Sequence, residues 1–397
     1  MTVTDALLLL IALPPTLCIA VVVAEAWLGF LLPKRKPSSD CTPGPITVLI
    51  PAHNEETGIT TTIASVQPQL RSEDRVLVVA DNCSDNTADN ARVAGAEVIE
   101  RHNEHERGKG YALAHGIEHL TANPPAVVVF IDADCTLAPD SLLPLARQAV
   151  SRQRPAQSLN LVDPPEQPSL KDRISVLAFL VKNLVRTRGL ARLNLPCALT
   201  GTGMAMPWDL ITTVDFASGH LVEDMQLGVN LTLTGKSARL CEQALVTSPA
   251  PSDQNAAGTQ RTRWEHGHLQ TIINHAPRLI LHGITRFRID PLVAGIDLTV
   301  PPLAMLCVLW LAITIALAAV ATLTPFGLGA LITLVAAGLL LLLTVVTAVI
   351  RDGGQRVGLV HLLAVPLYIL WKIPLYLRFL VARQTTWVRT QRDNGSG

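Results

Sequence analysis

The sequence predicts an α/β domain with a mostly parallel sheet, joined to helices that span a membrane. Short β-branched segments alternate with helix-like segments between Pro43 and about Pro291, and several of the strands end in polar or acidic residues. Such alternation is typical of a parallel sheet covered by helices on both faces. Residues 298 to 350 contain no charged side chain, which indicates helices in contact with lipid.

The composition agrees with a chain that is partly embedded in a membrane. Of the 397 residues, 49% are hydrophobic and only 16% are charged, against about 25% in soluble proteins. The formal net charge is zero, so bulk electrostatics gives no support for a nucleic-acid partner. The seven cysteines are scattered and form no CxxC pair, which fits a reducing compartment rather than a disulfide framework or a zinc site.

The first segment is predicted to be a retained membrane anchor over residues 1–33. Ala6 to Leu32 is apolar apart from Glu25, and it is long enough to span a bilayer. Lys34 to Lys36 follow it, whereas a cleavable signal peptide carries its basic residues before the apolar stretch. The positive-inside rule places this basic cluster in the cytoplasm and the N-terminus outside.

The middle of the chain is predicted to contain three buried parallel strands with helices between them. In such folds ligands bind beyond the carboxyl ends of the strands. The predicted strands are Ile46 to Ile50, Val76 to Val79 and Val127 to Ile131, and the helix-like segments are near Gly58 to Leu70, Asn86 to Ala94 and Gly108 to Leu120.

Acidic residues at two of these strand ends predict a metal and nucleotide site. Asp132 and Asp134 are alternate residues at the end of a strand, so both carboxylates can point to one place. Carboxylate oxygens suit Mg²⁺ or Mn²⁺. Asp81 can accept a hydrogen bond from a nucleobase or ribose, while Asp85 is expected to cap the following helix. Lys109, at a glycine-flanked helix start, is either a diphosphate ligand or an ordinary surface lysine.

Two later motifs are candidates for the transfer step. Glu223 and Asp224 precede a helical segment, and one of them can act as a general base, although acidic residues also favour helix N-termini for structural reasons. Gln260, Arg263 and Trp264 would share one helix face, where Arg can bind phosphate and Trp can contact a sugar. The structural alternative for the latter group is an interfacial membrane anchor.

The loop expected just before this motif, and the last apolar segments, complete the pattern. Pro249 to Thr259 is rich in small residues and proline and is a candidate lid. Spans are expected near 301–323 and 326–350. The segment 357–381 contains His361, Lys372 and Arg378, so it either crosses the membrane or lies along the cytoplasmic interface.

In their order, these motifs resemble glycosyltransferase family 2, in particular its membrane-embedded branch of cellulose, hyaluronan and poly-N-acetylglucosamine synthases and ceramide glucosyltransferase. The resemblance covers about residues 43 to 275. The matching motifs are Pro51-Ala52-His53-Asn54-Glu55, Asp81, Asp132-Ala133-Asp134, Glu223-Asp224 and Gln260-x-x-Arg263-Trp264.

This resemblance implies a GT-A fold over residues 34–285, between the anchor and a C-terminal membrane region over 286–397, and transfer with inversion from a nucleotide sugar that is usually UDP-linked. Asp134 would bind the metal with support from Asp132, and Asp224 would be the base beside Glu223. The implied substrate-binding residues are Pro51, Ala52, Asn54, Glu55, Asp81, Lys109, Asp132, Gly201, Gly203, Gln260, Arg263 and Trp264.

The sequence departs from the family pattern in two places. Ala80 stands where the family often has a first Asp before Asp81, and Val222 stands where it has Thr before Glu223-Asp224. The first change removes a carboxylate that could contact the nucleobase of the donor. The second keeps both carboxylates but removes the hydroxyl of the threonine.

The function expected from the sequence is a membrane-bound hexosyltransferase at the cytoplasmic face of the inner membrane. It would move a hexose or N-acetylhexosamine to a lipid or a polysaccharide, and a polymer product would call for an export or assembly partner. Two alternatives are a sugar-phosphate nucleotidyltransferase and a non-catalytic subunit that binds nucleotide or polysaccharide.

Overall fold

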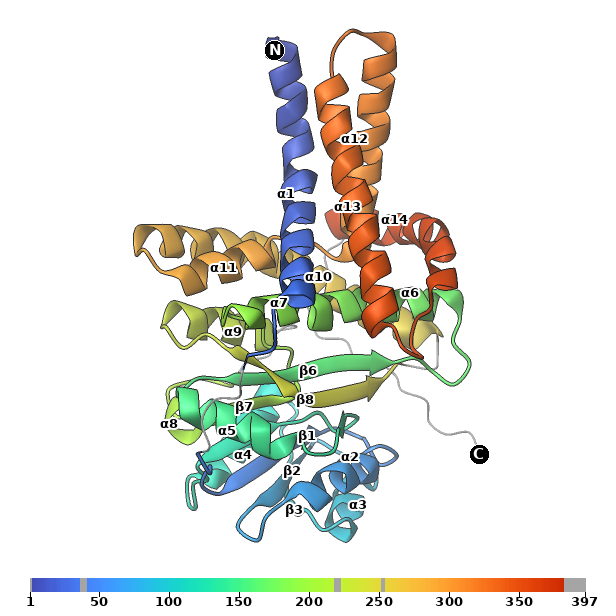
Figure 1. Ribbon diagram of the computed structural model, residues 1–397. Helices are drawn as coiled ribbons and strands as arrows, with labels where there is room; N and C mark the ends of the chain where they lie inside the picture. Colours follow the sequence, from blue (N-terminus) through green and yellow to red (C-terminus); the bar gives the residue numbers. More distant parts are fainter. Residues whose placement is uncertain (1, 36–40, 218–222, 251–253, 382–397) are drawn as a thin grey trace.

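The computed structural model describes residues 2–35, 41–217, 223–250 and 254–381; at 223, 254–257, 259–261, 263 and 377–381 it describes the backbone alone. The domain that contains the sheet lies at one end, a layer of helices covers it, and three long helices rise from that layer (Figure 1). This arrangement confirms the predicted α/β fold with flanking apolar helices.

One mixed sheet forms the centre of the domain. Its strand order is β3-β2-β1-β4-β7-β6-β8-β5. β1, β2, β3 and β4 are parallel, β7 is antiparallel to its two neighbours, and β6 and β8 are parallel. The strands are β1 (Ile46–Ala52), β2 (Arg75–Asp81), β3 (Glu97–Arg101), β4 (Val127–Phe130), β5 (Thr136–Leu137), β6 (Ala156–Asp163), β7 (Met204–Pro207) and β8 (Arg239–Pro249).

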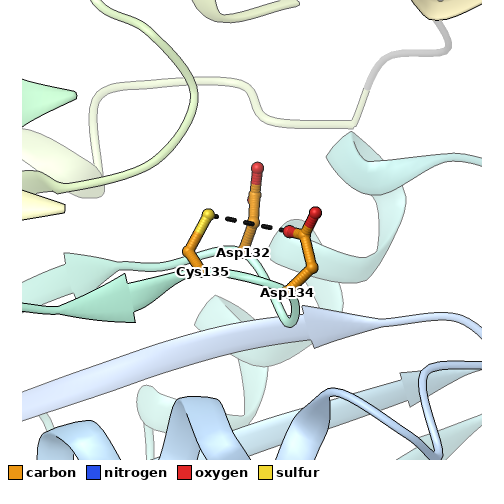
Figure 2. Close-up of side chains that lie close together, drawn as sticks. All are labelled: Asp132, Asp134 and Cys135. Atoms are coloured by element: carbon orange, nitrogen blue, oxygen red, sulfur yellow. Dashed lines mark hydrogen bonds between the residues drawn. The ribbon is translucent and has the colours of Figure 1, made fainter. Parts of the chain in front are cut away.

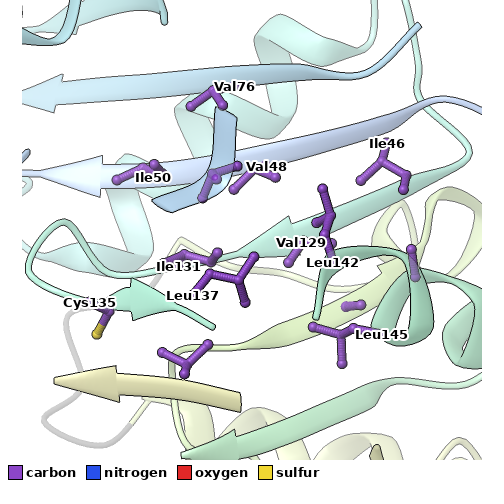
Figure 3. Close-up of a cluster of buried hydrophobic side chains, with 14 of the residues drawn as sticks. Ile46, Val48, Ile50, Val76, Val129, Ile131, Cys135, Leu137, Leu142 and Leu145 are labelled. Atoms are coloured by element: carbon purple, nitrogen blue, oxygen red, sulfur yellow. The ribbon is translucent and has the colours of Figure 1, made fainter. Parts of the chain in front are cut away.

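Alternate residues of the central strands supply two hydrophobic cores, one on each face of the sheet. Ile46, Val48 and Ile50 of β1 face one core (Figure 3), while Leu49 between them faces the other. Side chains with a period of two therefore account for the continuous apolar runs in the sequence. The first core packs on α2 (Ile59–Val66), α3 (Thr87–Val93) and α5 (Leu142–Arg152); the second packs on α4 (Lys109–Leu120), α8 (Trp208–Ile211) and α9 (Glu223–Leu233). A short helix, η1 (Gln67–Gln69), follows α2.

A nearly continuous helix crosses above β6, between the sheet and the long helices (Figure 1). It consists of α6 (Leu170–Leu180), a π-helical turn η2 (Val181–Arg186) and α7 (Thr187–Arg192). Ser169 and Asp172 form a capping box that fixes its start. Two further helices, α10 (Gln254–Thr285) and α11 (Ile289–Leu298), complete the layer.

Three apolar helices stand together on this layer: α1 (Val3–Leu31), α12 (Leu303–Leu323) and α13 (Leu328–Asp352) (Figure 1). Each is long and apolar enough to cross a membrane. Their shared interior is packed along its length. One buried group includes Ala12, Leu317 and Leu334, and a second extends from Ile19 to the lower turns of α13.

The last segments are η3 (Leu359–Ala364) and α14 (Val365–Val381). Residues 359 to 376 are also long and apolar enough to span a membrane. However, α14 does not rise beside α1, α12 and α13 but lies at their lower ends (Figure 1). Lys372 of α14 is buried, with an exposed fraction of 1%, and forms an ion pair with Glu265 of α10. The tail with Arg383, Arg389 and Arg392, which bears on the two alternatives for this segment, lies outside the described residues.

A buried ion-pair network ties the anchor to the helical layer. Arg186, at the end of the π-helical turn, donates Nε–H to Glu25 Oε2 of α1 at 2.6 Å and also pairs with Asp297 of α11. The backbone approaches closely nearby, since a Cβ placed on Gly189 would lie 1.7 Å from the carbonyl oxygen of Glu25. Glu25 therefore serves as an internal partner within an otherwise apolar segment.

The structure corrects two sequence-based expectations. The expected loop from Pro249 to Thr259 is wrong over most of its length, because α10 already begins at Gln254; residues 251 to 253 lie outside the described part. The strand that ends before Asp132 is the fourth along the chain rather than the third, because the short, partly charged β3 was not recognised. β3 lies at the sheet edge, where few apolar residues are needed.

Candidate active site

A cavity of about 420 Å³ lies between the carboxyl ends of the central strands and the helical layer. On the sheet side it is lined by Asp132 and Asp134, and on the side of the long helices by Leu303 and Ala304. Six of the residues singled out from the sequence line it: Lys109, Asp132, Asp134, Gly201, Asp224 and Trp264. Residues far apart in the sequence thus meet in one place.

The Asp132–Asp134 loop follows β4 and is held from both sides. The amide of Asp132 donates to Thr202 Oγ1 at 3.1 Å, and Thr62 Oγ1 of α2 donates to the carbonyl oxygen of Ala133 at 2.8 Å. Asp132, Asp134 and Cys135 point to the same side of the loop (Figure 2), and their ligand atoms lie within 4.8 Å of one another. The two hydrogen bonds hold the loop backbone from which both carboxylates project.

The donor set at this loop fits a hard divalent cation. Burial, together with the charges of Asp134 and Asp132, raises the pKa of the Cys135 thiol well above its usual value, so the thiol stays protonated. Its Sγ lies 3.6 Å from Asp134 Oδ1, where it donates a weak hydrogen bond. The two carboxylates are therefore the suitable ligands, and oxygen ligands are those preferred by Mg²⁺ and Mn²⁺.

Lys109 lies at the centre of the polar part of the cavity. It begins α4, next to Gly108 with φ of 129°, a conformation that side chains rarely adopt. Its Nζ forms an ion pair with Asp132 and donates to the carbonyl oxygen of Gly201 at 2.8 Å. Lys109 is thus not an ordinary surface lysine, because its ammonium is paired with Asp132 within the cavity.

Asp224 approaches Lys109 across Gly201. A Cβ added to Gly201 would lie 3.3 Å from both Asp224 Oδ2 and Lys109 Nζ, and the φ of this glycine is 82°. Asp224 Oδ1 accepts a hydrogen bond from the amide of Met225 at 2.9 Å. Burial raises the pKa of the Asp224 carboxyl, while the charges of Lys109 and Lys182 oppose that rise. A carboxylate with a raised pKa in a cavity is a suitable proton acceptor.

The first two polar loops pack on each other outside the lining of this cavity. Asp81 has an exposed fraction of only 5% and forms an ion pair with Arg101 at 2.8 Å. Asn54 Oδ1 accepts from the amide of Ser84 at 2.7 Å, and the amide of Glu55 donates to Thr87 Oγ1 at 2.7 Å. These two loops therefore form a separate surface, called the rim, that consists of Pro51, Ala52, Asn54, Glu55 and Asp81. Gly203 is also outside the cavity lining, and its amide donates to the carbonyl oxygen of Phe130.

The Gln260-Arg263-Trp264 motif lies on α10, as its spacing predicts. Trp264 lines the cavity with 39% of its surface exposed, and its ring lies 5.6 Å from that of Phe179 on α6. The side chains of Gln260, Arg263 and Glu223 lie outside the described residues. Of this motif, the described side chain is thus the aromatic one, at the edge of the cavity.

Sequence reasoning missed several basic residues of this region, among them Arg101 and Lys182. Arg101, on the unrecognised strand β3, pairs with Asp81 and lies 5.6 Å from the centre of the Tyr111 ring. Lys182, in the π-helical turn, lines the cavity. The spacing of Lys182 and Arg186 at i and i+4 signals one basic helix face, but the π-helical turn itself has no signal in the sequence.

Comparisons with known protein families give two matches. The model described as glycosyl transferase family 2 matches residues 47–154. The model described as glycosyl transferase family group 2 matches residues 127–373, more than half of the chain, and extends through the helical layer into the apolar helices. No curated protein sequence gives a significant match.

Solved structures with a similar fold include a mannosyltransferase from Pyrobaculum calidifontis in complex with GDP-Man and Mn²⁺. The likeness covers 92% of this chain and 99% of that chain, at 16% identity and a TM-score of 0.51. A weaker likeness over part of the chain is to glucosyl-3-phosphoglycerate synthase from Mycobacterium tuberculosis in complex with Mn²⁺, UDP-glucose and phosphoglyceric acid. It covers 57% of this chain and 79% of that chain, at 22% identity and a TM-score of 0.36.

Proposed function

The chain belongs to glycosyl transferase family group 2, and from that premise we propose that it is a membrane-bound, inverting hexosyltransferase. It moves a hexose or N-acetylhexosamine from a nucleotide sugar to an acceptor at the cytoplasmic membrane face. The observation that carries this proposal is the single cavity that contains Asp132, Asp134, Lys109 and Asp224. A pair of carboxylates, a cation and a partly buried base are the groups that transfer from a diphospho-sugar requires.

The proposed roles follow from position. Asp134 and Asp132 would hold Mg²⁺ or Mn²⁺, which when bound would offset charge on the donor diphosphate. Lys109, at the start of α4, binds the diphosphate from the other side. Asp224 takes the proton of the acceptor hydroxyl, whose oxygen attacks the anomeric carbon opposite the leaving diphosphate. The hydroxyl oxygen forms the new bond as the bond to the diphosphate breaks, so the configuration inverts.

The other predicted site residues are assigned by their surroundings. Asp81, with Pro51, Ala52, Asn54 and Glu55 beside it, is proposed to bind the nucleoside at the rim. Gln260 and Arg263 are proposed to bind the diphosphate, and Trp264, Gly201 and Gly203 to shape the acceptor side. The proposed donor is UDP-linked; because the mannosyltransferase of similar fold binds GDP-Man, GDP-sugars belong in the test as well.

The proposed division of the chain is an anchor at 1–33, a catalytic domain at 34–285 and a C-terminal membrane region at 286–397. The helices that can cross a membrane make the protein membrane-associated. We place it in the inner membrane with the catalytic domain in the cytoplasm, because Lys34 and Arg35 follow the first span.

The test is release of the nucleoside diphosphate by the purified chain in nanodiscs, over a panel of UDP-, GDP- and TDP-sugars with Mg²⁺ or Mn²⁺. One donor should be turned over. Asp224→Asn should lower kcat by about 10²–10⁴-fold, the usual contribution of a general base, with nucleotide affinity retained. Asp134→Asn should weaken both turnover and nucleotide binding. Near wild-type transfer by Asp224→Asn would disprove the assigned base.

A further inference from the structure

The cavity has a second half that the donor does not require. Beyond Asp224 it is lined by Phe179 and Val181 of the helical layer and by residues from the bases of the membrane helices. The latter are Val22 of α1, Leu303 and Ala304 of the first turn of α12, and Tyr368 of α14. These residues give this half an apolar wall between the helical layer and the lower ends of the long helices.

The cavity does not continue upward between the long helices in the part of the chain that the structure describes. Trp310 of α12 packs against Gly338 of α13, where an added Cβ would lie 2.1 Å from the indole, and Trp310 Nε1 donates to the carbonyl oxygen of Leu334 at 2.8 Å. Ala12 of α1 is buried in the same interface. A packed interior of this kind leaves no path for a sugar polymer through these three helices.

A lysine of the π-helical turn faces this second half. Lys182 lines the cavity, and no hydrogen bond from its Nζ is present among the described residues. Its neighbour Arg186 is already paired with Glu25 and Asp297. Burial and the charge of Arg186 lower the pKa of Lys182, so the lysine gains from an anionic ligand.

We propose, on the basis of the function proposed above, that the acceptor is a membrane lipid with an anionic headgroup, and that Lys182 binds that headgroup. The lipid chain lies against Phe179, Leu303 and Ala304, so it stays at the level of the bilayer. The headgroup then extends toward Asp224, which lies in the same cavity. The group of a headgroup that a lysine ammonium binds best is a phosphate. Because the nucleotide donor also carries phosphates, the test must separate binding of the lipid from binding of the donor.

The test measures lipid retention and nucleotide affinity on the same full-length protein. The probes are phosphatidylglycerol and phosphatidylcholine, added in detergent and detected by native mass spectrometry. Lys182→Met should retain phosphatidylglycerol about tenfold less than wild type, the loss expected for one charge-assisted hydrogen bond. Lys182→Arg should keep most of it. Lys171→Met is the matched control, because Lys171 lies on the same helix, 4.4 Å from the centre of the Trp371 ring, outside the cavity lining.

A second pair of variants tests the cavity rather than the charge. Ala304→Trp should fill the space next to Phe179 and displace the lipid while Lys182 remains in place. Ala316→Trp, on an exposed position of the same helix, should leave retention unchanged. Together the two pairs separate binding inside the cavity from general attraction of anionic lipid to the surface.

The outcomes are distinct. Equal retention by wild type and Lys182→Met, or no preference for phosphatidylglycerol over phosphatidylcholine, would overturn the inference and leave a neutral lipid as acceptor. Weaker nucleotide binding by Lys182→Met, with unchanged lipid retention, would assign Lys182 to the donor diphosphate and would also overturn it. Neither result touches the proposed transferase, which depends on donor turnover and its loss in Asp224→Asn.

Discussion

At the scale of single residues, the site depends on a carboxylate that the fold keeps partly out of water. Burial raises the pKa of Asp224, and Lys109 is the largest of the charges that counter this effect. Because the base works only when ionised, kcat/KM should fall as the pH drops through this raised pKa. The acid limb of the pH profile should therefore lie above the ordinary Asp value of about 3.9.

The same pH profile tests whether the charge of Lys182 acts on Asp224. Lys182 helps to keep Asp224 ionised, so Lys182→Met should move the acid limb to higher pH. Lys171→Met should leave the limb where it is. An acid limb that moves to lower pH in Lys182→Met would contradict the assignment of this limb to Asp224.

The raised pKa also predicts the effect of Asp224 on stability. A carboxyl group whose pKa is higher in the folded state stabilises the fold at low pH, and this contribution is lost as the pH rises through that pKa. At neutral pH the ionised Asp224 carboxylate therefore lowers the free energy of unfolding. Asp224→Asn should melt at the same temperature as wild type or higher, as measured by thermal unfolding in nanodiscs. A lower Tm would mean that the loss of activity cannot be attributed to the base alone.

The sequence alone pointed to most of the candidate site residues, but it did not predict which of them lie next to one another. Asp132, Asp134 and Asp224 stand out because acidic residues directly follow apolar strands or begin a helix. That Lys109 lies close to Asp224 could not be predicted, because it depends on the absence of a side chain at Gly201, which would otherwise meet both. Lys182 was missed because nothing in a helical sequence indicates which face will line a cavity.

At the scale of elements, one glycine sets the contact between the anchor and the domain. Gly189 of α7 meets the backbone of α1 at Glu25 so closely that an added Cβ would lie 1.7 Å from a carbonyl oxygen. Backbone cannot move aside as a flexible side chain can. Gly189→Ala should therefore destabilise the protein by about 1–3 kcal/mol, the usual cost of overpacking, seen as a lower Tm in nanodiscs.

A second helical glycine provides the control. Gly329 in α13 has no atom within 4 Å of an added Cβ, so Gly329→Ala should not lower the Tm. If Gly189→Ala melts like wild type, the close packing of α1 on α7 does not contribute to stability as proposed.

The helices and strands that the sequence predicted best are those with a regular pattern of apolar residues. The parallel strands β1, β2 and β4, the helices between them and the apolar helices were found close to their observed bounds. The short β3 and the start of α10 were missed for local reasons. β3 is an edge strand with charged residues, and α10 begins with small and polar residues that also favour loops.

At the scale of the whole molecule, the order of the layers predicts a topology. The sheet domain lies at the same end of α1 as Lys34 and Arg35, and α14 lies at that end as well (Figure 1). A tag before Thr2 should be cleaved by protease added to intact spheroplasts, and a tag after the last residue should be protected. If the C-terminal tag is also cleaved, the segment 357–381 crosses the membrane after all.

The π-helical turn has a consequence for how this chain can change over evolution. Such a turn holds one residue more than an α-helix of the same span, and it arises by a single insertion. Deleting one residue from 181–186 would therefore return the turn to an α-helix and leave α6 and α7 in place. Phe179 would stay in the cavity, while Lys182, inside the turn, would change its direction. Relatives without the inserted residue should thus share the anchor contact and differ in what they accept.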